Sequence, residues 1–207
     1  MDEKNKHLEN LKEVRSLMEK SSFFLSLSGL SGVAAGVVGI IAAVYLIDLI
    51  PAKLLENTVI TDSPIKKSYT QHLILFAAVT LIITFSLVFF FTYLQSRKKD
   101  ISLQSGAAKR MTLNLFIPLI AGGIFSLILI LNGYFSIVPV VTLLFYGVSL
   151  INAGKFTFVE IRYLGFAELL LGLLAAYFIT YSLWFWGAGF GLLNILYGII
   201  MYLKYEK

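Results

Sequence analysis

Six apolar runs, each about 18 residues or longer, constrain the fold of this 207-residue chain more than any other feature. A helix rises about 1.5 Å per residue, so about 20 residues are needed to cross the ~30 Å hydrocarbon core of a bilayer. The runs are continuous and do not alternate with a period of two, which argues against the strands of a membrane β-barrel. The sequence therefore predicts an all-α polytopic integral membrane protein with a bundle of six transmembrane helices, at about 22–50, 70–95, 113–131, 134–152, 164–181 and 183–203.

Composition agrees with a membrane location, because 58% of the residues are hydrophobic and soluble domains contain nearer ~45–50%. Cysteine is absent from the sequence, which excludes disulfides, thiol nucleophiles and thiolate metal ligands. Residues 1–21 are predicted to form a cytoplasmic amphipathic leader helix, and residues 22–207 the transmembrane domain. The apolar side of the leader is formed by Leu8, Leu11, Val14, Leu17 and Met18. The leader either docks onto a cytoplasmic partner or a second copy of the chain, or lies along the inner membrane interface.

The distribution of Lys and Arg predicts the orientation of the chain, because these residues are retained on the cytoplasmic side of short loops. Fourteen of the 17 fall in the N-terminal segment, the second and fourth connections and the C-terminal tail. The opposite set contains Lys53, Lys66 and Lys67. Both termini are therefore predicted to face the cytoplasm. This asymmetry also accounts for the formal net charge of +5, so a nucleic-acid partner is not expected.

The first and last apolar runs carry small residues at three- and four-residue spacing, which places these residues on one side of a helix. Such stripes let two transmembrane helices approach closely. In the first run the small residues are Ser28, Gly32, Gly36 and Gly39, and in the last run they are Gly187, Gly191 and Gly198. We predict that both stripes are helix-packing surfaces. Their partner is either another span of the same chain, which is the favoured interpretation, or a second protomer.

One carboxylate, Glu168, lies inside the otherwise apolar fifth run. An ionised acid in a bilayer is costly, so such a group usually faces the bundle interior or pairs with another polar group. From the predicted start of the fifth span, Glu168 would lie about 6–8 Å from the cytoplasmic boundary. An antiparallel last span would bring Tyr197 and Gly198 to a similar depth, with Asn194 one turn deeper. The predicted intramembrane polar site therefore consists of Glu168, Asn194 and Tyr197.

Two interpretations of Glu168 stay open. In the first, it is a protonatable or cation-binding group. In the second, which is favoured, it is a structural acid that is hydrogen-bonded across helices near the membrane interface. Lys155 and Arg162 at the inner boundary, or Tyr146 on the fourth span, are the partners that the predicted topology would bring near it.

The sequence predicts no catalytic, metal-binding or cofactor-binding residues. The stretch Gly29-Leu30-Ser31-Gly32 resembles the G-x-S-G pattern of rhomboid proteases, which also have six spans and need an intramembrane histidine as base. The two histidines here are His7 in the leader and His72 near the outer end of the second span, and neither lies at the level of Ser31. Motifs for zinc, haem or phosphate binding are also absent from the sequence. We therefore expect neither a cofactor nor enzymatic activity.

Family resemblance is carried by three segments, FLSLSGLSGV (24–33), LINAGKFTFVEIRYLG (150–165) and YGIIMYLKYEK (197–207). Together they resemble a family of small six-span bacterial membrane proteins to which no function is assigned. The resemblance runs along most of the chain and implies a multi-pass protein of the bacterial cytoplasmic membrane. It supplies no binding or catalytic residue.

From the residues we expect a non-enzymatic scaffold, sensor or accessory subunit that meets cytoplasmic protein partners or forms a homo-oligomer. The packing glycines, the amphipathic leader and the scarcity of intramembrane charge favour this interpretation. The alternative is a small transporter or channel whose path passes Glu168 and Asn194.

Overall fold

The computed structural model describes residues 29–50, 64–98 and 106–205, and every regular element in these ranges is helical. The long helices are α2 (Gly29–Leu49), α4 (Pro64–Lys98), α5 (Gly106–Asn132), α6 (Val138–Ala153) and α7 (Val159–Tyr177). The chain then continues through α8 (Ser182–Gly187), the π-helical segment η3 (Ala188–Leu193) and α9 (Asn194–Tyr205), which together we call the C-terminal helix. Two short 3-10 turns, η1 (Phe135–Ile137) and η2 (Ile179–Tyr181), precede α6 and α8. The predicted leader helix and Ser28 lie outside the described residues.

Five helical stretches are long and apolar enough to cross a membrane, namely Gly29–Leu49, Lys67–Gln95, Lys109–Asn132, Phe135–Ala153 and Ile179–Tyr205. The prediction of an all-helical chain with several long apolar helices is therefore confirmed. The fifth predicted run corresponds to α7, which has 19 residues but carries three charged side chains, Glu160, Arg162 and Glu168.

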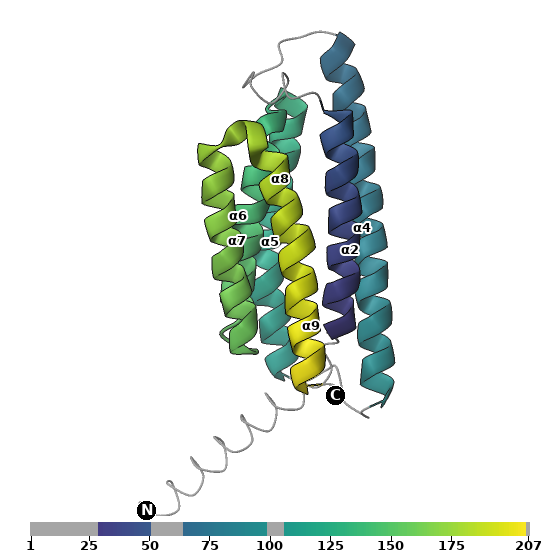
Figure 1. The fold of residues 1–207 in the computed structure, drawn as a ribbon, viewed down its shortest axis with the longest axis vertical. Coiled ribbons are helices and arrows are strands. Elements are labelled where there is room, and N and C mark those ends of the chain that lie inside the picture. The colour runs from purple at the N-terminus through teal and green to yellow at the C-terminus, as the bar shows by residue number, and fades with distance from the viewer. Residues whose placement is uncertain (1–28, 51–63, 99–105, 206–207) are drawn as a thin grey trace, which may run out of the picture.

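The helices run side by side, and helices that follow one another in the chain are antiparallel (Figure 1). α2 packs against α4 and the C-terminal helix, α6 packs against α5 and α7, and α7 packs against the C-terminal helix. α4 lies at the edge of the bundle, where large apolar side chains such as Leu75, Ile82 and Phe89 are exposed. Other long helices also carry large exposed apolar side chains, so the outer surface of the bundle is apolar over much of its height.

The tight turn between α5 and α6 makes these two helices antiparallel neighbours. Gly133 has a φ of 85°, a left-handed conformation that side chains with a Cβ rarely adopt. The amide groups of Gly133 and Tyr134 donate hydrogen bonds to the carbonyl groups of Ile130 and Leu129, at 3.1 and 2.9 Å. These bonds satisfy carbonyl groups that the end of α5 would otherwise leave without a partner.

Glycine residues of α2 and of the C-terminal helix face one another along a line that we call the glycine seam. Its members are Gly32, Gly36 and Gly39 on one side and Gly187, Gly191 and Gly198 on the other. A Cβ added at Gly36 would collide with the Gly191 carbonyl group, and one added at Gly198 would collide with the backbone of Val33. The backbones of the two helices therefore touch, and the absence of side chains along the seam makes this approach possible.

A second close approach fixes α7 on α6. Gly147 and Gly165 lie opposite one another, and a Cβ added to either would come within 2.8 Å of the carbonyl oxygen of the other. A Cβ at Gly172 would meet the side chain of Leu144 at the same distance. Gly165, Glu168 and Gly172 are spaced by three and four residues and are all buried. The packing that buries the two glycines therefore also turns Glu168 into the bundle.

Candidate functional site

The candidate site is centred on the carboxyl group of Glu168, which is fully buried at 0% exposure. Glu168 is nine residues from either end of α7, a distance of about 13 Å along the helix axis. Neither carboxyl oxygen has a hydrogen-bond partner among the described residues. Buried polar groups are normally hydrogen-bonded, so a carboxyl group with two unpartnered oxygens requires an explanation.

The carboxyl group is enclosed by residues from two neighbouring elements. Gly189 of the π-helical segment lies so close that a Cβ at this position would collide with Glu168 Oε2. The same Cβ would also meet the side chain of Leu143 on α6, which is itself fully buried. On the side of the C-terminal helix, Glu168 Oε2 therefore lies against the backbone of Gly189, and the glycine is what makes room for the acid.

A hydrogen-bonded network lies beside the carboxyl group and joins α6 to the C-terminal helix. The Tyr146 hydroxyl donates to Asn194 Oδ1 at 2.9 Å, and Asn194 Nδ2 donates to the Gly189 and Phe190 carbonyl groups at 3.2 and 3.3 Å. Tyr146 is also close enough to Glu168 for the two groups to interact electrostatically. Asn194 therefore supplies donors to two carbonyl groups of the π-helical segment, and Tyr146 holds Asn194 in place.

Aromatic rings cover the network. Phe190 stacks on Tyr146 with ring centroids 4.8 Å apart and contacts Trp186 at 5.0 Å. Trp186 donates from its indole nitrogen to the Thr142 hydroxyl group at 3.0 Å. These contacts hold Trp186 of α8 and Phe190 of the π-helical segment against α6, although the segment itself contains two glycines.

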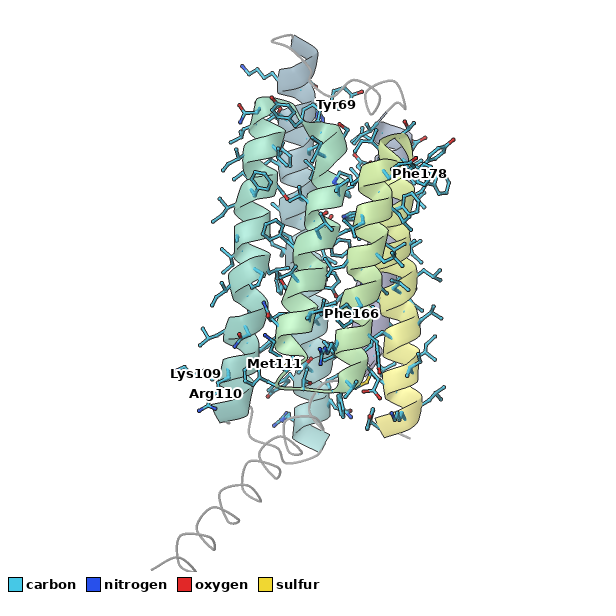
Figure 2. All side chains as sticks on the ribbon, turned by 90° about the vertical axis from the view of Figure 1, so that its left-hand side faces the viewer. Tyr69, Lys109, Arg110, Met111, Phe166 and Phe178 are labelled. Carbon is cyan, nitrogen blue, oxygen red and sulfur yellow. The ribbon has the colours of Figure 1, made fainter. Side chains whose placement is uncertain are left out.

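Tyr197 lies nearer to one end of the bundle than the other predicted site residues. Its hydroxyl group is buried and has no hydrogen-bond partner among the described residues. Its ring packs against a core cluster that includes Met111, Leu164 and Ala153. Figure 2 places Met111 close to Lys109 and Arg110, at the end of the bundle opposite Tyr69. The structure thus places Asn194 beside the surroundings of Glu168 and places Tyr197 farther toward that end.

The expected register between α7 and the C-terminal helix is wrong. Tyr197 and Gly198 were expected level with Glu168, but Gly189 faces it, and Gly198 packs against α2. The hairpin explains the shift, because the 3-10 turn η2 closes it from residue 179, earlier than expected, and so pairs Glu168 with an earlier residue of the C-terminal helix. In addition, α7 begins at Val159 instead of near residue 164. Glu168 consequently lies at the middle of its helix and not near the end.

The basic residues considered as partners of Glu168 lie elsewhere. Arg162 is exposed, and its guanidinium group lies 5.8 Å from the ring centroid of Phe166. Lys155 is exposed in the connection between α6 and α7. Of the three partners considered, only Tyr146 is brought close to the acid.

A second glutamate on α7 has surroundings of the opposite kind. Glu160, in the first turn, accepts hydrogen bonds from Lys204 and from the Tyr205 hydroxyl group on α9. Burial by itself would raise the pKa of the Glu160 carboxyl, but the hydrogen bonds from Lys204 and Tyr205 outweigh this effect and lower its pKa below the ordinary value. Glu160 therefore serves as a natural reference for Glu168, being on the same helix but paired.

The described residues contain no group of three or more His, Asp or Glu side chains that could hold a metal ion. Ser31 lies near the beginning of α2, while His72 lies near the beginning of α4, at the opposite end of the bundle (Figure 1). His72 is in contact with the Ser68 carbonyl group at 2.7 Å. The serine and histidine of the protease-like pattern are therefore far apart.

The sequence interpretation missed Gly189, Leu143 and the π-helical segment. One signal was present, since Gly187, Gly189 and Gly191 alternate over five residues just before Asn194. Such a density of glycine weakens an α-helix. π-helical turns frequently occur at functional sites.

No protein-family model matches the chain, and comparisons with curated proteins and with solved structures also give no match. The family resemblance of the three segments therefore stays a prediction.

Proposed function

We propose that the chain is an integral membrane protein that crosses the bilayer six times, with α7 as the additional span beside the five long apolar helices. α7 has 19 residues and is about 28 Å long at 1.5 Å per residue, and η2 closes the hairpin at the far end of the predicted span 164–181. Glu160 and Arg162 lie before this span, and Glu168 is buried inside the bundle, so no charged side chain of α7 would face lipid. The apolar outer surface of the bundle supports the same conclusion, because soluble monomers rarely expose large continuous apolar patches.

The proposed orientation places both termini in the cytoplasm. Lys109 and Arg110 lie at one end of the bundle (Figure 2), and α6 and α9 end on that same side (Figure 1). Lys155 follows the end of α6, and Lys204 lies in the last turn of α9. Basic residues concentrate on the cytoplasmic side of membrane proteins. The bacterial cytoplasmic membrane as the location rests on the family resemblance.

The proposed function is that of a small transporter or channel in which a proton or a small cation moves past Glu168. One observation carries this proposal, namely the fully buried carboxyl group with no hydrogen-bond partner among the described residues. A buried, unpaired acid destabilises a helix bundle, and ionisable residues within transmembrane segments mark ion pathways and proton relays. A scaffold or accessory subunit has no need of such a group, which is why the transporter is favoured over the scaffold expected from sequence.

The test is flux through liposomes that contain the purified protein, with a pH-sensitive dye inside and an imposed gradient of protons, Na⁺ or K⁺. Wild-type protein is compared with Glu168→Gln and with Glu160→Gln, which makes the same chemical change at a paired glutamate on the same helix. We expect flux from the wild type and from Glu160→Gln, and loss of flux from Glu168→Gln. Absence of flux from folded wild-type protein, or equal flux from both variants, would contradict the proposal and favour a scaffold with cytoplasmic partners.

A further inference from the structure

We infer that the species bound at Glu168 is a proton and not a metal cation, so that the side chain is a neutral carboxylic acid in this conformation. The inference deepens the proposed function and rests on it, because it names the species that the Glu168 site would carry. The binding step is the transfer of one proton from hydronium on one side of the membrane to the carboxylate, which leaves a water molecule, and release of that proton to water on the other side restores the carboxylate.

The first argument is the room around the carboxyl group. Oε2 lies against the backbone of Gly189, so closely that a single added carbon there would collide with it, and Leu143 lies on the same side. A bound proton needs no additional volume. A metal cation between this oxygen and Gly189 would require the π-helical segment to move away from α7.

The second argument is the chemistry of the neighbouring oxygen atoms. A hard cation takes several oxygen ligands at once. Two oxygen atoms of the neighbouring network are held in place by Asn194, because the Gly189 carbonyl group accepts from its amide and the Tyr146 hydroxyl group donates to its oxygen, so a cation would need the remaining lone pairs of both to be turned toward it. The oxygen atoms near Glu168 are thus held in a network of hydrogen bonds, while a proton requires only the carboxyl group itself.

The third argument is the charge of the groups that face Glu168. α6 brings Tyr146 beside Glu168, α9 carries Tyr197 farther toward the end of the bundle, and α8 and η3 contain no titratable residue. On α7 itself, Glu160 is paired with Lys204 near the end of the bundle, and Arg162 is exposed. No cation among the described residues compensates an ionised Glu168, and a buried acid without compensation becomes neutral by binding a proton.

The test is infrared spectroscopy of the purified protein in lipid at neutral pH, which detects a neutral carboxylic acid by its carbonyl stretching band. We expect this band in the wild type and in Glu160→Gln, and its absence in Glu168→Gln. We also expect the band to stay unchanged when Na⁺ or K⁺ is added. The inference would be overturned if Glu168 gave only the band of an ionised carboxylate. It would also be overturned if the band of the neutral acid disappeared on addition of Na⁺ or K⁺.

Stability measurements provide a second readout that does not depend on transport. A neutral acid and a glutamine have the same charge, so Glu168→Gln is expected to unfold at a temperature close to that of the wild type at neutral pH. A large loss of stability in this variant, together with absence of the Glu168 infrared band from the wild type, would indicate that the ionised form is the one built into the fold. The infrared band can be present when liposomes give no flux, so failure of the proposed transport and failure of this inference are distinguishable.

Discussion

At position 189 the backbone touches the carboxyl group of another helix, and a hydrogen atom is all that fits there. The opposite situation occurs at Gly123 on α5, where an added Cβ would have no heavy atom within 4 Å. The two glycines look equivalent in the sequence, since each lies in an apolar helix next to another small residue or glycine. Their difference arises from tertiary packing, which is why the sequence revealed Glu168 as an unusual acid but not the glycine that accommodates it.

We expect Gly189→Ala to destabilise the protein by about 1–3 kcal/mol, the usual cost of overpacking a tight interior. The added methyl group would collide with Glu168 Oε2 and with Leu143. Gly123→Ala is the matched control, and it should leave stability unchanged or raise it by about 0.5–1 kcal/mol, because alanine favours a helix over glycine. Thermal unfolding in detergent measures both. Equal effects of the two substitutions would contradict the packing described at Gly189.

The Tyr146–Asn194 hydrogen bond gives a second prediction. Tyr146→Phe and Asn194→Ala should each destabilise the protein, because each leaves a polar group without its partner. The double variant should lose less than the sum of the two, with a coupling energy of about 0.6–1.7 kcal/mol, the range for hydrogen bonds between membrane helices. Unfolding of the four proteins measures the coupling. Strict additivity would mean that the bond contributes nothing to stability.

The sequence was most informative about the positions of the helices. Continuous apolar runs are enough to predict long helices, and small-residue stripes are visible at helical spacing. The register between α7 and the C-terminal helix was not predictable, because closure of the hairpin by η2 depends on local turn geometry that hydropathy does not encode. Because the hairpin closes a few residues earlier than expected, the neighbour of Glu168 on the C-terminal helix is Gly189 and not Gly198.

Substitution of glycine by alanine in the glycine seam is expected to reduce the stability of the protein by different amounts at different positions. Gly36→Ala should destabilise the protein by about 1–3 kcal/mol, because its methyl group would collide with the Gly191 carbonyl group and with Ile195. Gly187→Ala should cost less, since its methyl group would meet only the Ala43 side chain. Unfolding temperatures of the two variants provide the comparison. A larger loss of stability for Gly187→Ala than for Gly36→Ala would contradict the packing described along the glycine seam.

The ends of α7 and α9 contribute stability that depends on pH. The folded-state pKa of Glu160 is lowered, so its contribution is present above the ordinary pKa of about 4.5 and is lost as pH falls through the folded value. Wild-type protein should therefore lose stability on acidification below about pH 4.5 more steeply than Glu160→Gln. Unfolding measured between neutral and acidic pH tests this. Parallel curves would show that the pair with Lys204 is not formed in solution.

Across the whole molecule, the number of membrane crossings decides how Glu168 is presented to the two sides. Five helical stretches are long and apolar enough to cross a membrane. Composition alone does not place α7 among them, because three of its residues are charged. Its packing between α6 and the C-terminal helix is what places it inside the bundle. The exposed positions at the two ends of α7 make the crossing measurable.

The absence of cysteine makes the chain a ready background for labelling. Single cysteines at Asn132, Lys155 and Tyr181, all exposed, are treated with a membrane-impermeant maleimide from either side. With six crossings we expect Lys155→Cys to react only from the cytoplasmic side and the other two only from outside. Reaction of Lys155→Cys and Tyr181→Cys from the same side would show that α7 does not cross.

The π-helical segment has a consequence for how such a chain could have arisen. A π-turn holds one more residue than an α-turn, so η3 resembles a single-residue insertion into an ancestral regular helix. Each residue of an α-helix turns the chain by about 100°, so deletion of Ala188 would rotate the two parts of the C-terminal helix against each other by roughly that angle. Gly189 could then no longer face α7 while Gly198 faces α2. The extra residue is what allows one continuous helix to serve two different neighbours.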